Sequence, residues 1–310
     1  MKALIVNVNL AIDKTVLVPV FRPGRVHRFT GAITQPGGKG VNVARALKEL
    51  GCGPVVAGFV GGHNGRWIEE QLPLENFPAL LVRHSAGESR ICFSAVDPAG
   101  ISTDFNEEGP AVPPAAQALL LRKLAKSAGA FQVAAVCGRM STGLKKGFYA
   151  RLTRALKKAG CFTAFDTTGA PLLEGIGAGA DLVKINKSEF EEISGRTFSR
   201  SSVRLFFKKH CPFGLKALIV TSGPRPTLAV SQFGLWEVRP VPLRRLASPV
   251  GAGDSFMAGF LYGFMKGLFF ENNLKLATGC AASDCLTLGA GRISRCQAEA
   301  FAAKVRVIEF

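Results

Sequence analysis

Acidic residues are scarce in this sequence, and this scarcity limits the partners that we expect. Only 22 Asp and Glu residues oppose 39 Lys and Arg residues, which gives a formal net charge of +17. The basic pairs lie far apart along the chain, and no aromatic residues alternate with them as in a nucleic-acid interface. We interpret the surplus as solvated helix faces and a few contacts to a phosphorylated substrate. We therefore expect no nucleic-acid partner.

The cysteines also lack the spacing of metal sites. The eight cysteines form no C-x-x-C pair and no zinc-like pattern. Several lie inside apolar runs, such as Cys137 in VAAVCG, where a free thiol behaves as a small buried hydrophobe. The N-terminal MKALIVNVNL is too short an apolar run for a signal peptide, and the stretch 256–265 is too short for a membrane span. We expect a cytoplasmic protein without a membrane partner.

Internal repeats, low-complexity linkers, a Walker A loop and a G-x-G-x-x-G fingerprint are also missing. What the sequence does contain is 310 residues with 47% hydrophobic content, enough for one large α/β domain or two modest ones. Strand-like and helix-like segments alternate, and this order predicts a parallel sheet with helices on both faces. The predicted strands are 2–8, 55–59, 133–137, 161–166, 181–185 and 217–222, and the predicted C-terminal helices are 253–266, 271–288 and 296–304.

Two pairs of short segments interrupt this alternation and predict a second, smaller sheet. TVLVPV and RVHRFTGAI flank Pro23-Gly24, and ICFSAV and STDFNE flank residues 97–100, as in hairpins. We expect residues 13–35 and 90–107 to form a β lid over an active site, inserted into a core of residues 1–12, 36–89 and 108–310. Because such a lid exposes a sheet edge and an apolar face, we expect a homodimer through it.

The stretch VGAGDSFMAGFLYG, residues 250–263, is the strongest candidate for a catalytic centre. Gly251, Ala252 and Gly253 are small enough for consecutive N–H groups to face one point at a helix N-terminus, which favours an anion. The negative charge of Asp254 would repel that anion. Its presence there makes sense if the carboxylate accepts a proton from a hydroxyl that attacks phosphorus. The alternative is a glycine-rich start of a buried helix with an acidic first turn.

A second glycine cluster, PGGKG, precedes the helix-like segment VNVARALKELG. Gly37 and Gly38 would allow a ligand to approach the backbone closely, Lys39 supplies positive charge, and Asn42 on the first helical turn can face the same ligand. The alternative is a glycine-rich turn with a solvated lysine. Two glycine-and-helix sites suggest two ligands, one at each site.

The predicted strand DLVKI is followed by polar residues that favour a nucleotide site. Because the carboxyl ends of parallel strands line the ligand crevice, Asn186 and Glu189 are expected near a nucleotide phosphate and its magnesium. The alternative is an ordinary helix start, with Asn186 or Ser188 as the cap and Glu189 in the first turn. The segment 221–223 at the end of ALIVTS has the same two interpretations, a border of the nucleotide or a simple turn.

The ordered motifs GGKGVNVARALKELG, LVKINKSEF and VGAGDSFMAGF together resemble the PfkB, or ribokinase-like, sugar kinase family over nearly the whole chain. NVNLAIDKT, GESRICFSAV and STDFNEEGP are similar to the 1-phosphofructokinase and tagatose-6-phosphate kinase branch. The resemblance implies a ribokinase-like α/β fold, ATP and Mg²⁺ as cofactors, and a ketohexose monophosphate as substrate. Fructose 1-phosphate is the first expectation, and tagatose 6-phosphate or fructose 6-phosphate is the second. The alternative of another class is a sugar-phosphate sensor without turnover.

Carried over by position, the resemblance implies a role for each motif residue. Asp254 would be the base, and the anion hole would be formed by the amides of Gly251, Ala252 and Gly253. The sugar hydroxyls would be held by Asp13, Gly37, Gly38 and Asn42. The substrate phosphate would be held by Lys39 and Arg90, with help from Arg25 or Arg28 of the lid. ATP and magnesium would be served by Lys184, Asn186 and Glu189 near Asp166, with Thr221, Ser222 and Gly223 at the nucleotide border.

The sequence departs from the family pattern at four positions. Leu10 replaces a proline in the first motif, and Pro249 replaces a threonine before VGAGD, which removes a hydroxyl and an N–H beside the expected anion hole. Pro226 replaces the last glycine of the nucleotide loop, and it is the main support for the sensor. Arg139 in CGRMSTG replaces a small serine, and it is either a fork-shaped phosphate contact or a surface residue.

Overall fold

A ten-stranded sheet runs through the computed structural model, which describes residues 1–29 and 31–310. The strand order is β14-β13-β12-β11-β10-β9-β8-β1-β4-β5. The pairs from β5 to β11 are parallel, and those from β11 to β14 are antiparallel. The strands are β1 (Lys2–Asn7), β4 (Gly53–Gly61), β5 (Ala79–His84), β8 (Val133–Cys137), β9 (Phe162–Asp166), β10 (Leu182–Asn186), β11 (Ala217–Ser222), β12 (Arg225–Ser231), β13 (Gly234–Arg239) and β14 (Arg306–Glu309).

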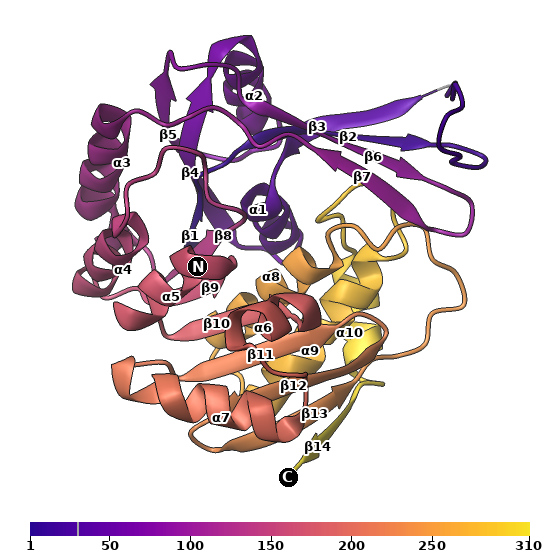
Figure 1. The fold of residues 1–310 in the computed structure, drawn as a ribbon. Helices are drawn as coiled ribbons and strands as arrows, with labels where there is room; N and C mark the ends of the chain where they lie inside the picture. Colours follow the sequence, from indigo (N-terminus) through magenta and orange to yellow (C-terminus); the bar gives the residue numbers. More distant parts are fainter. Residues whose placement is uncertain (30) are drawn as a thin grey trace.

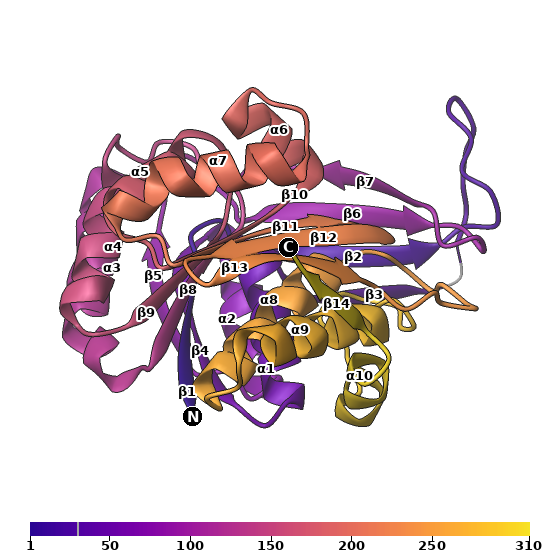
Figure 2. The same cartoon turned by 90° about the horizontal axis from the view of Figure 1, so that it is seen from below.

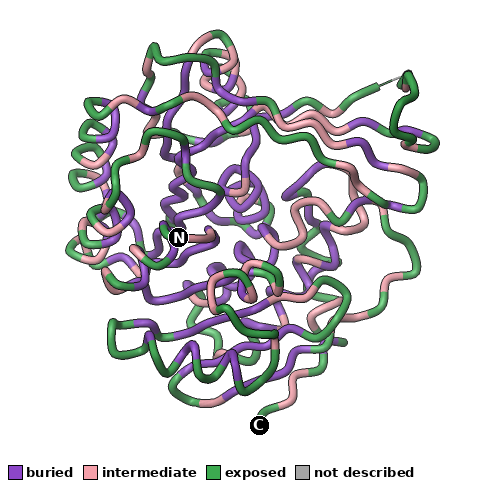
Figure 3. Tube along the Cα trace, in the orientation of Figure 1, coloured by how far each residue is buried: buried purple, intermediate pink, exposed green. Residues whose placement is uncertain are grey.

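Helices cover both faces of this sheet and enclose two apolar cores (Figures 1 and 2). One core contains α1 (Lys39–Glu49), α2 (Gly62–Leu74), α8 (Ala252–Met265), α9 (Phe270–Asp284) and α10 (Arg295–Ala302). The other contains α3 (Pro114–Ser127), α4 (Phe148–Lys158), α5 (Gly169–Gly177), α6 (Lys187–Ser194) and α7 (Arg200–His210). Side chains alternate between the cores along β1, with Ile5 in one and Leu4 in the other. The sheet is therefore buried on both sides (Figure 3), as a parallel sheet requires.

The smaller sheet has the order β3-β2-β6-β7 and extends from one side of the main body (Figure 1). It consists of β2 (Ala11–Leu17), β3 (Ala32–Gly37), β6 (Arg90–Val96) and β7 (Ser102–Asn106). The two segments that form it are far apart in the sequence and are joined by the parallel pair β2 and β6. The predicted fold class, a mostly parallel sheet with helices on both faces and a small second sheet, is therefore confirmed.

One strand of the small sheet lies later in the chain than the sequence predicted. Of the expected strand RVHRFTGAI, Ala32 and Ile33 belong to β3, which continues through Pro36 to Gly37 opposite Ala11. Pro23 and Gly24 lie outside any strand, and Thr30 lies outside the described residues. The cause is that β3 is an edge strand, where a proline costs no ladder hydrogen bond, so the pairing extends into the glycine cluster.

Four strands of the large sheet were not predicted at all: β5, β12, β13 and β14. Pro226, expected in a nucleotide loop, is the second residue of β12, next to the tight turn that pairs Ser222 with Arg225. The register shifts beside this turn, and such an irregularity accommodates a proline within a sheet. In the part of the chain that the structure describes, no helix combines the length and apolarity needed to cross a membrane.

Candidate active site

Polar side chains from distant parts of the chain meet at the carboxyl edge of the parallel strands. Cys137 of β8 pairs in register with Asp166 of β9, and Asn186 of β10 pairs with Thr221 of β11. Since these strands are parallel, all four residues lie at or next to the last position of their strands, at the same edge of the sheet. Lys39, at the start of α1, reaches Asp166 from 127 positions away in the sequence. The edge is therefore where the predicted motifs meet.

Asp166 is the most completely buried carboxylate of this cluster. Its Oδ1 accepts from Lys39 Nζ at 3.1 Å and its Oδ2 from Lys184 Nζ at 2.6 Å. Burial alone would raise the pKa of Asp166, but the two ammonium groups outweigh it and hold that pKa below its ordinary value. Lys39 Nζ also lies 3.2 Å from Glu189 Oε1, and the charge of Asp166 is the main reason that the pKa of Lys39 is raised. A network of two lysines and two carboxylates results.

Asp254 lies in the first turn of α8 and is buried. Its Oδ2 accepts a hydrogen bond from Asn42 Nδ2 at 2.9 Å, which joins the two glycine motifs. Burial and the negative charge of Asp166 raise the pKa of Asp254 to about 7, against the opposing effects of Lys39, Lys184 and Asn42. A carboxylate with a pKa near neutrality is able to take up a proton during a reaction, which is the property that a general base needs.

The start of α8 combines a tight backbone turn with a nearby ammonium group. Gly251 is the N-cap with φ 91°, and a Cβ there would lie 2.7 Å from Asp284 Oδ2, so only glycine fits. Ala252 N donates to Pro249 O at 3.3 Å, whereas first-turn amides such as that of Gly253 have no helical acceptor. Lys184 Nζ lies 2.9 Å from the place that a Cβ on Gly253 would take. The helix N-terminus and the lysine together favour an anion at this point.

Asp13, Gly37 and Gly38 come together at the start of α1. Asp13 contacts Gly37 so closely that a Cβ on this glycine would overlap the carboxylate. Asp13 Oδ2 accepts from Gly38 N at 3.2 Å, and burial raises the pKa of Asp13. Three of the four residues that the family resemblance assigns to sugar hydroxyls thus form one group, and Asp13 also anchors the N-terminus of the helix that carries the fourth, Asn42.

The two arginines expected to bind the substrate phosphate differ in their surroundings. Arg90 is buried, and it donates to Asn9 O at 3.2 Å through Nε and to Glu107 O at 3.3 Å through Nη1. Arg139 leaves 72% of its side chain exposed and lies 3.5 Å from Glu108 Oε1. Arg90, the first residue of β6, therefore binds the backbone next to β2 and β7, whereas the structure does not bring Arg139 into the cluster.

The residues predicted for nucleotide and magnesium form a helix cap. Asn186 Oδ1 accepts from Glu189 N at 2.9 Å, and Glu189 Oε2 accepts from Asn186 N at 2.8 Å, so both form the capping box of α6. Thr221 Oγ1 donates to Ile185 O at 3.4 Å, with Ser222 and Gly223 following it at the end of β11. The alternative of an ordinary helix start thus describes the local geometry of α6, although Glu189 Oε1 still faces Lys39.

A magnesium ion carried by nucleotide phosphates fits this part of the site. Within residues 1–29 and 31–310, no group of three or more His, Cys, Asp or Glu side chains is arranged to hold a metal ion. Magnesium bound through phosphates and waters needs only one or two protein carboxylates. The carboxylate of Glu189, which is partly exposed and adjacent to the cluster, meets that requirement.

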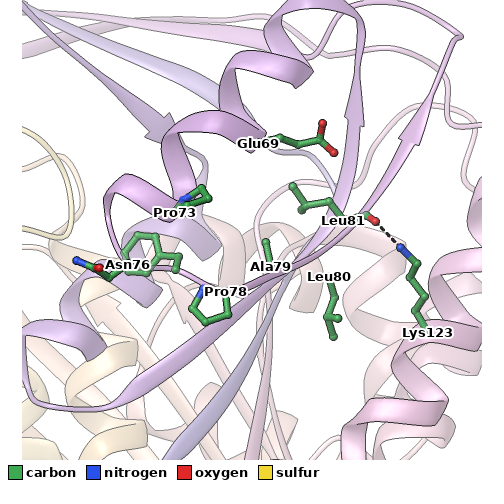
Figure 4. Close-up of a pocket in the computed structure, with 9 residues that line it drawn as sticks. Glu69, Pro73, Asn76, Pro78, Ala79, Leu80, Leu81 and Lys123 are labelled. Carbon is green, nitrogen blue, oxygen red and sulfur yellow. Dashed lines mark hydrogen bonds between the residues drawn. The ribbon is translucent and has the colours of Figure 1, made fainter.

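An open groove of about 660 Å³ lies elsewhere, beside the edge strand β5 (Figure 4). Residues of α2 and β5 line it, and Lys123 of α3 closes one side by donating to Leu81 O at 2.8 Å. None of the cluster residues lines this groove. Lys123 occupies a carbonyl of an edge strand and so hinders another strand from pairing there. We therefore interpret Lys123 as protection of the sheet edge, and we do not interpret the groove as a ligand site.

Two buried charged residues near the site were not singled out from the sequence. Arg45 hydrogen-bonds to Asn42 Oδ1 through Nη1 at 3.2 Å. Asp284, whose pKa is raised by burial to about 6, accepts from Arg292 N at 2.8 Å behind Gly251. Arg45 could have been found from the sequence, because it lies three positions after Asn42 and therefore on the same face of the helix. Nothing in the apolar sequence around Asp284 signalled the second.

The large parallel sheet, its antiparallel extension and the small second sheet together form a ribokinase-like α/β fold. The model of the pfkB family of carbohydrate kinases matches residues 5–295. The 1-phosphofructokinase of Rhodobacter capsulatus is 33% identical over 291 residues, which cover 88% of this chain and 87% of the relative. The tagatose-6-phosphate kinase of Staphylococcus epidermidis is 26% identical over 310 residues, which cover 99% of both chains.

The solved structures support the same fold. Phosphofructokinase-2 from Escherichia coli superposes with a TM-score of 0.85 and 23% identity over 98% of both chains. The chain therefore belongs to the pfkB family of carbohydrate kinases. It is a phosphotransferase that uses an alcohol group as acceptor, and its relatives are sugar-phosphate kinases.

Proposed function

We propose that this chain transfers the γ-phosphoryl group of ATP to a ketohexose monophosphate, and first of all to the 6-hydroxyl group of fructose 1-phosphate. The observation that carries the proposal is the buried Asp254 carboxylate, with a pKa of about 7, at the glycine-rich start of α8. The identity to the Rhodobacter capsulatus 1-phosphofructokinase supports this sugar. Tagatose 6-phosphate is the second candidate because of the Staphylococcus relative, and fructose 6-phosphate the third.

Asp254 acts as the general base in this proposal. As the sugar hydroxyl oxygen forms its bond to the γ-phosphorus and the bond to ADP breaks, the hydroxyl proton moves to the carboxylate. Asn42 holds the Oδ2 atom by its hydrogen bond of 2.9 Å and so orients the acceptor. The negative charge on the phosphoryl oxygens is stabilised by the amides at 251–253 and by Lys184, which lies beside them.

The nucleotide occupies the side of the site formed by β10 and β11. Magnesium, when bound with the nucleotide, neutralises phosphate charge. We assign to ATP and Mg²⁺ the residues Lys184, Asn186, Glu189, Thr221, Ser222 and Gly223. Glu189 and Asn186 are the metal residues of this set, through water, since both are already engaged in the cap of α6.

The sugar occupies the side formed by α1 and the small sheet. We assign Asp13, Gly37, Gly38 and Asn42 to its hydroxyls, and Lys39 and Arg90 to its phosphate, with the exposed Arg139 as an outer contact that has to move inward. Of the two inner residues, Lys39 needs a test. Lys39 fits this assignment least, because its two partners, Asp166 and Glu189, belong to the nucleotide side. Lys39→Ala decides the point. A larger rise in KM for the sugar phosphate than for ATP supports the assignment, and a larger rise for ATP moves Lys39 to the nucleotide.

We also propose that two copies associate through the small sheet. Its strands expose large apolar side chains that water does not favour, including Leu17 and Phe105, each 53% exposed. A second copy would cover them. Sedimentation at micromolar concentration tests this: a dimer that Phe105→Asp converts to a monomer supports the proposal, and a wild-type monomer contradicts it.

The eight free cysteines favour a cytoplasmic, reducing location.

A coupled ADP-release assay tests the substrate. Wild-type protein with ATP and magnesium is assayed in parallel with fructose 1-phosphate, tagatose 6-phosphate and fructose 6-phosphate. We expect the highest kcat/KM with fructose 1-phosphate. A preference for either of the other sugars replaces that assignment, and turnover with none of the three rejects the proposed substrate class.

A further inference from the structure

Arg45 of α1 is buried, and every N–H of its guanidinium is donated to a named acceptor. Nε and Nη2 donate to the two carboxylate oxygens of Glu75 at 2.7 and 3.0 Å. Nη1 donates to Asn42 Oδ1 at 3.2 Å and to Ala290 O at 2.8 Å, and Nη2 also donates to Pro36 O at 2.9 Å. An arginine has five N–H donors, so none is left for a ligand. The residue therefore acts on the site only through its neighbours.

Each acceptor other than Glu75 leads to a different part of the site. Asn42 holds Asp254. Ala290 lies against Gly251, where a Cβ would approach Ala290 Cα to 2.7 Å. Pro36 precedes Gly37 and Gly38, and the amide N–H of Gly38 donates to Asp13 Oδ2. One side chain thus connects the base, the helix start proposed as the anion hole, and the glycine cluster proposed for the sugar.

The contact with Asn42 also fixes the orientation of its amide. Arginine can only donate, so the group of Asn42 that faces Nη1 at 3.2 Å has to be the oxygen Oδ1. The amide nitrogen Nδ2 is then directed to Asp254 Oδ2. A flipped amide would place a carbonyl oxygen against the carboxylate and repel it. Arg45 therefore selects the rotamer in which Asn42 stabilises the ionised base.

We propose that Arg45 is a positioning residue for phosphoryl transfer, which fixes Asn42 against Asp254 and joins the loops 36–38 and 289–291 to the same helix. The inference rests on the function proposed for Asp254. Glu75, the C-cap residue of α2, compensates the charge of the buried guanidinium, and this makes it the natural control. Glu75 supports the fold around Arg45 but contacts no residue of the proposed site.

The kinetic test compares Arg45→Met, Arg45→Lys, Glu75→Gln, Asn42→Ala and the double variant Arg45→Met/Asn42→Ala. If Arg45 acts through Asn42, Arg45→Met lowers kcat at least about tenfold more than Glu75→Gln at a similar loss of thermal stability. The double variant is then no more than about threefold slower than Asn42→Ala alone, because the two changes remove the same interaction. Equal losses for Arg45→Met and Glu75→Gln, or losses that multiply in the double variant, overturn the inference. Arg45→Lys replaces Arg45→Met if the latter does not fold.

A titration that needs no turnover separates this inference from the proposed substrate. The pKa of Asp254 is followed by ¹³C NMR of its carboxyl group in wild type and in Arg45→Lys. The groups that contribute most to the pKa of Asp254 are Asp166, Lys39, Lys184 and Asn42, the Cys137 thiol also lies near it, and none of them is altered. We expect the pKa to rise by roughly half to one unit when the amide of Asn42 is no longer held. An unchanged pKa overturns the inference, even if the wild type turns over none of the three sugars.

Discussion

A buried aspartate lies near lysines at each end of strands β9 and β10: Asp181, just before β10, at one end, and Asp254 of α8 at the other. The two carboxylates are paired to different degrees. At the amino end, Asp181 accepts from Lys157 Nζ at 2.7 Å through both oxygens and lies 2.9 Å from Lys216 Nζ. Thr163 N and Thr163 Oγ1 donate to Asp181 Oδ2 as well, at 2.8 and 2.9 Å. At the carboxyl end, Asp254 has Asn42 as its hydrogen-bonded side-chain partner.

The difference in pairing gives opposite pKa shifts. Burial would raise the pKa of Asp181, but its lysine and threonine donors hold that pKa below the ordinary value. Burial raises the pKa of Asp254 to about 7, and the neighbouring charge of Asp166 adds to the effect. A carboxylate whose charge is fully compensated stabilises the fold, whereas one that is incompletely compensated is ready to accept a proton. A structural carboxylate, Asp181, thus lies at one end of these strands, and a reactive one, Asp254 of α8, lies at the other.

Asp254→Asn should produce the largest effect on activity. The amide keeps the shape of the side chain but cannot accept the hydroxyl proton, so kcat should fall by about a thousandfold or more, with little change in sugar binding. The melting temperature at about pH 8 should rise, because the variant no longer buries a charge that is disfavoured there. Steady-state kinetics and differential scanning calorimetry measure the two quantities. Near-normal turnover would show that Asp254 is not the base.

Asp181→Asn should give the opposite result. It removes a buried acceptor of several hydrogen bonds, so the free energy of unfolding should fall by about 2 kcal/mol, while kcat stays close to that of the wild type. Urea unfolding followed by fluorescence gives the free energy, and the ADP-release assay gives kcat. If Asp181→Asn lost turnover in proportion to Asp254→Asn, the division between a structural and a reactive end would be wrong.

The two carboxylates should also separate activity from stability as the pH falls. The base works only when it is unprotonated, so kcat/KM should fall about tenfold per unit below the Asp254 pKa of about 7. Asp181 has a lowered pKa in the folded state, so its contribution to stability is complete above the unfolded value and is lost only as the pH falls through the folded value. Activity should therefore disappear well before the fold does.

Rate profiles and circular dichroism over the same pH range check this order. Asn42→Ala is the control, because loss of its hydrogen bond should move the acid limb of the rate profile to higher pH. Simultaneous loss of activity and secondary structure would contradict the assignment of the limb to Asp254.

The parts of the fold that could be predicted from the sequence are those with buried faces on both sides. Such strands read as continuous apolar runs, and β8 and β11 have the predicted bounds of 133–137 and 217–222. β12 begins with Arg225 and Pro226, which read as a turn, and its pairing is fixed only by the neighbouring strands. β3 runs into the glycine cluster for the same reason, since its partner β2 and not its own composition defines the strand.

The site was predictable where residues belong to a motif and not where they meet only in space. Asn42 and Asp254 lie in the two recognised glycine motifs and hydrogen-bond across 212 positions. The contacts of Lys39 with Asp166, and those of Arg45 with Ala290, depend on how α1 packs against the strand ends and the loop after α9. No spacing in the sequence encodes such a contact, so only the structure could reveal which ion pairs form.

The smallest expected effect distinguishes the two lysines that compensate Asp181. Lys157 touches both carboxylate oxygens with a side chain that is 34% exposed, whereas Lys216 touches one with a side chain that is 65% exposed. Exposed ion pairs contribute little because water screens them, so Lys216→Met should cost less than about 0.5 kcal/mol and Lys157→Met about 1 kcal/mol. Urea unfolding at low and high salt measures both. Added salt should reduce the difference in unfolding free energy from the wild type less for Lys157→Met than for Lys216→Met. If neither variant lost stability, the pairing of Asp181 would rest on its Thr163 hydrogen bonds, and neutral donors instead of charge would hold the structural end of the strands.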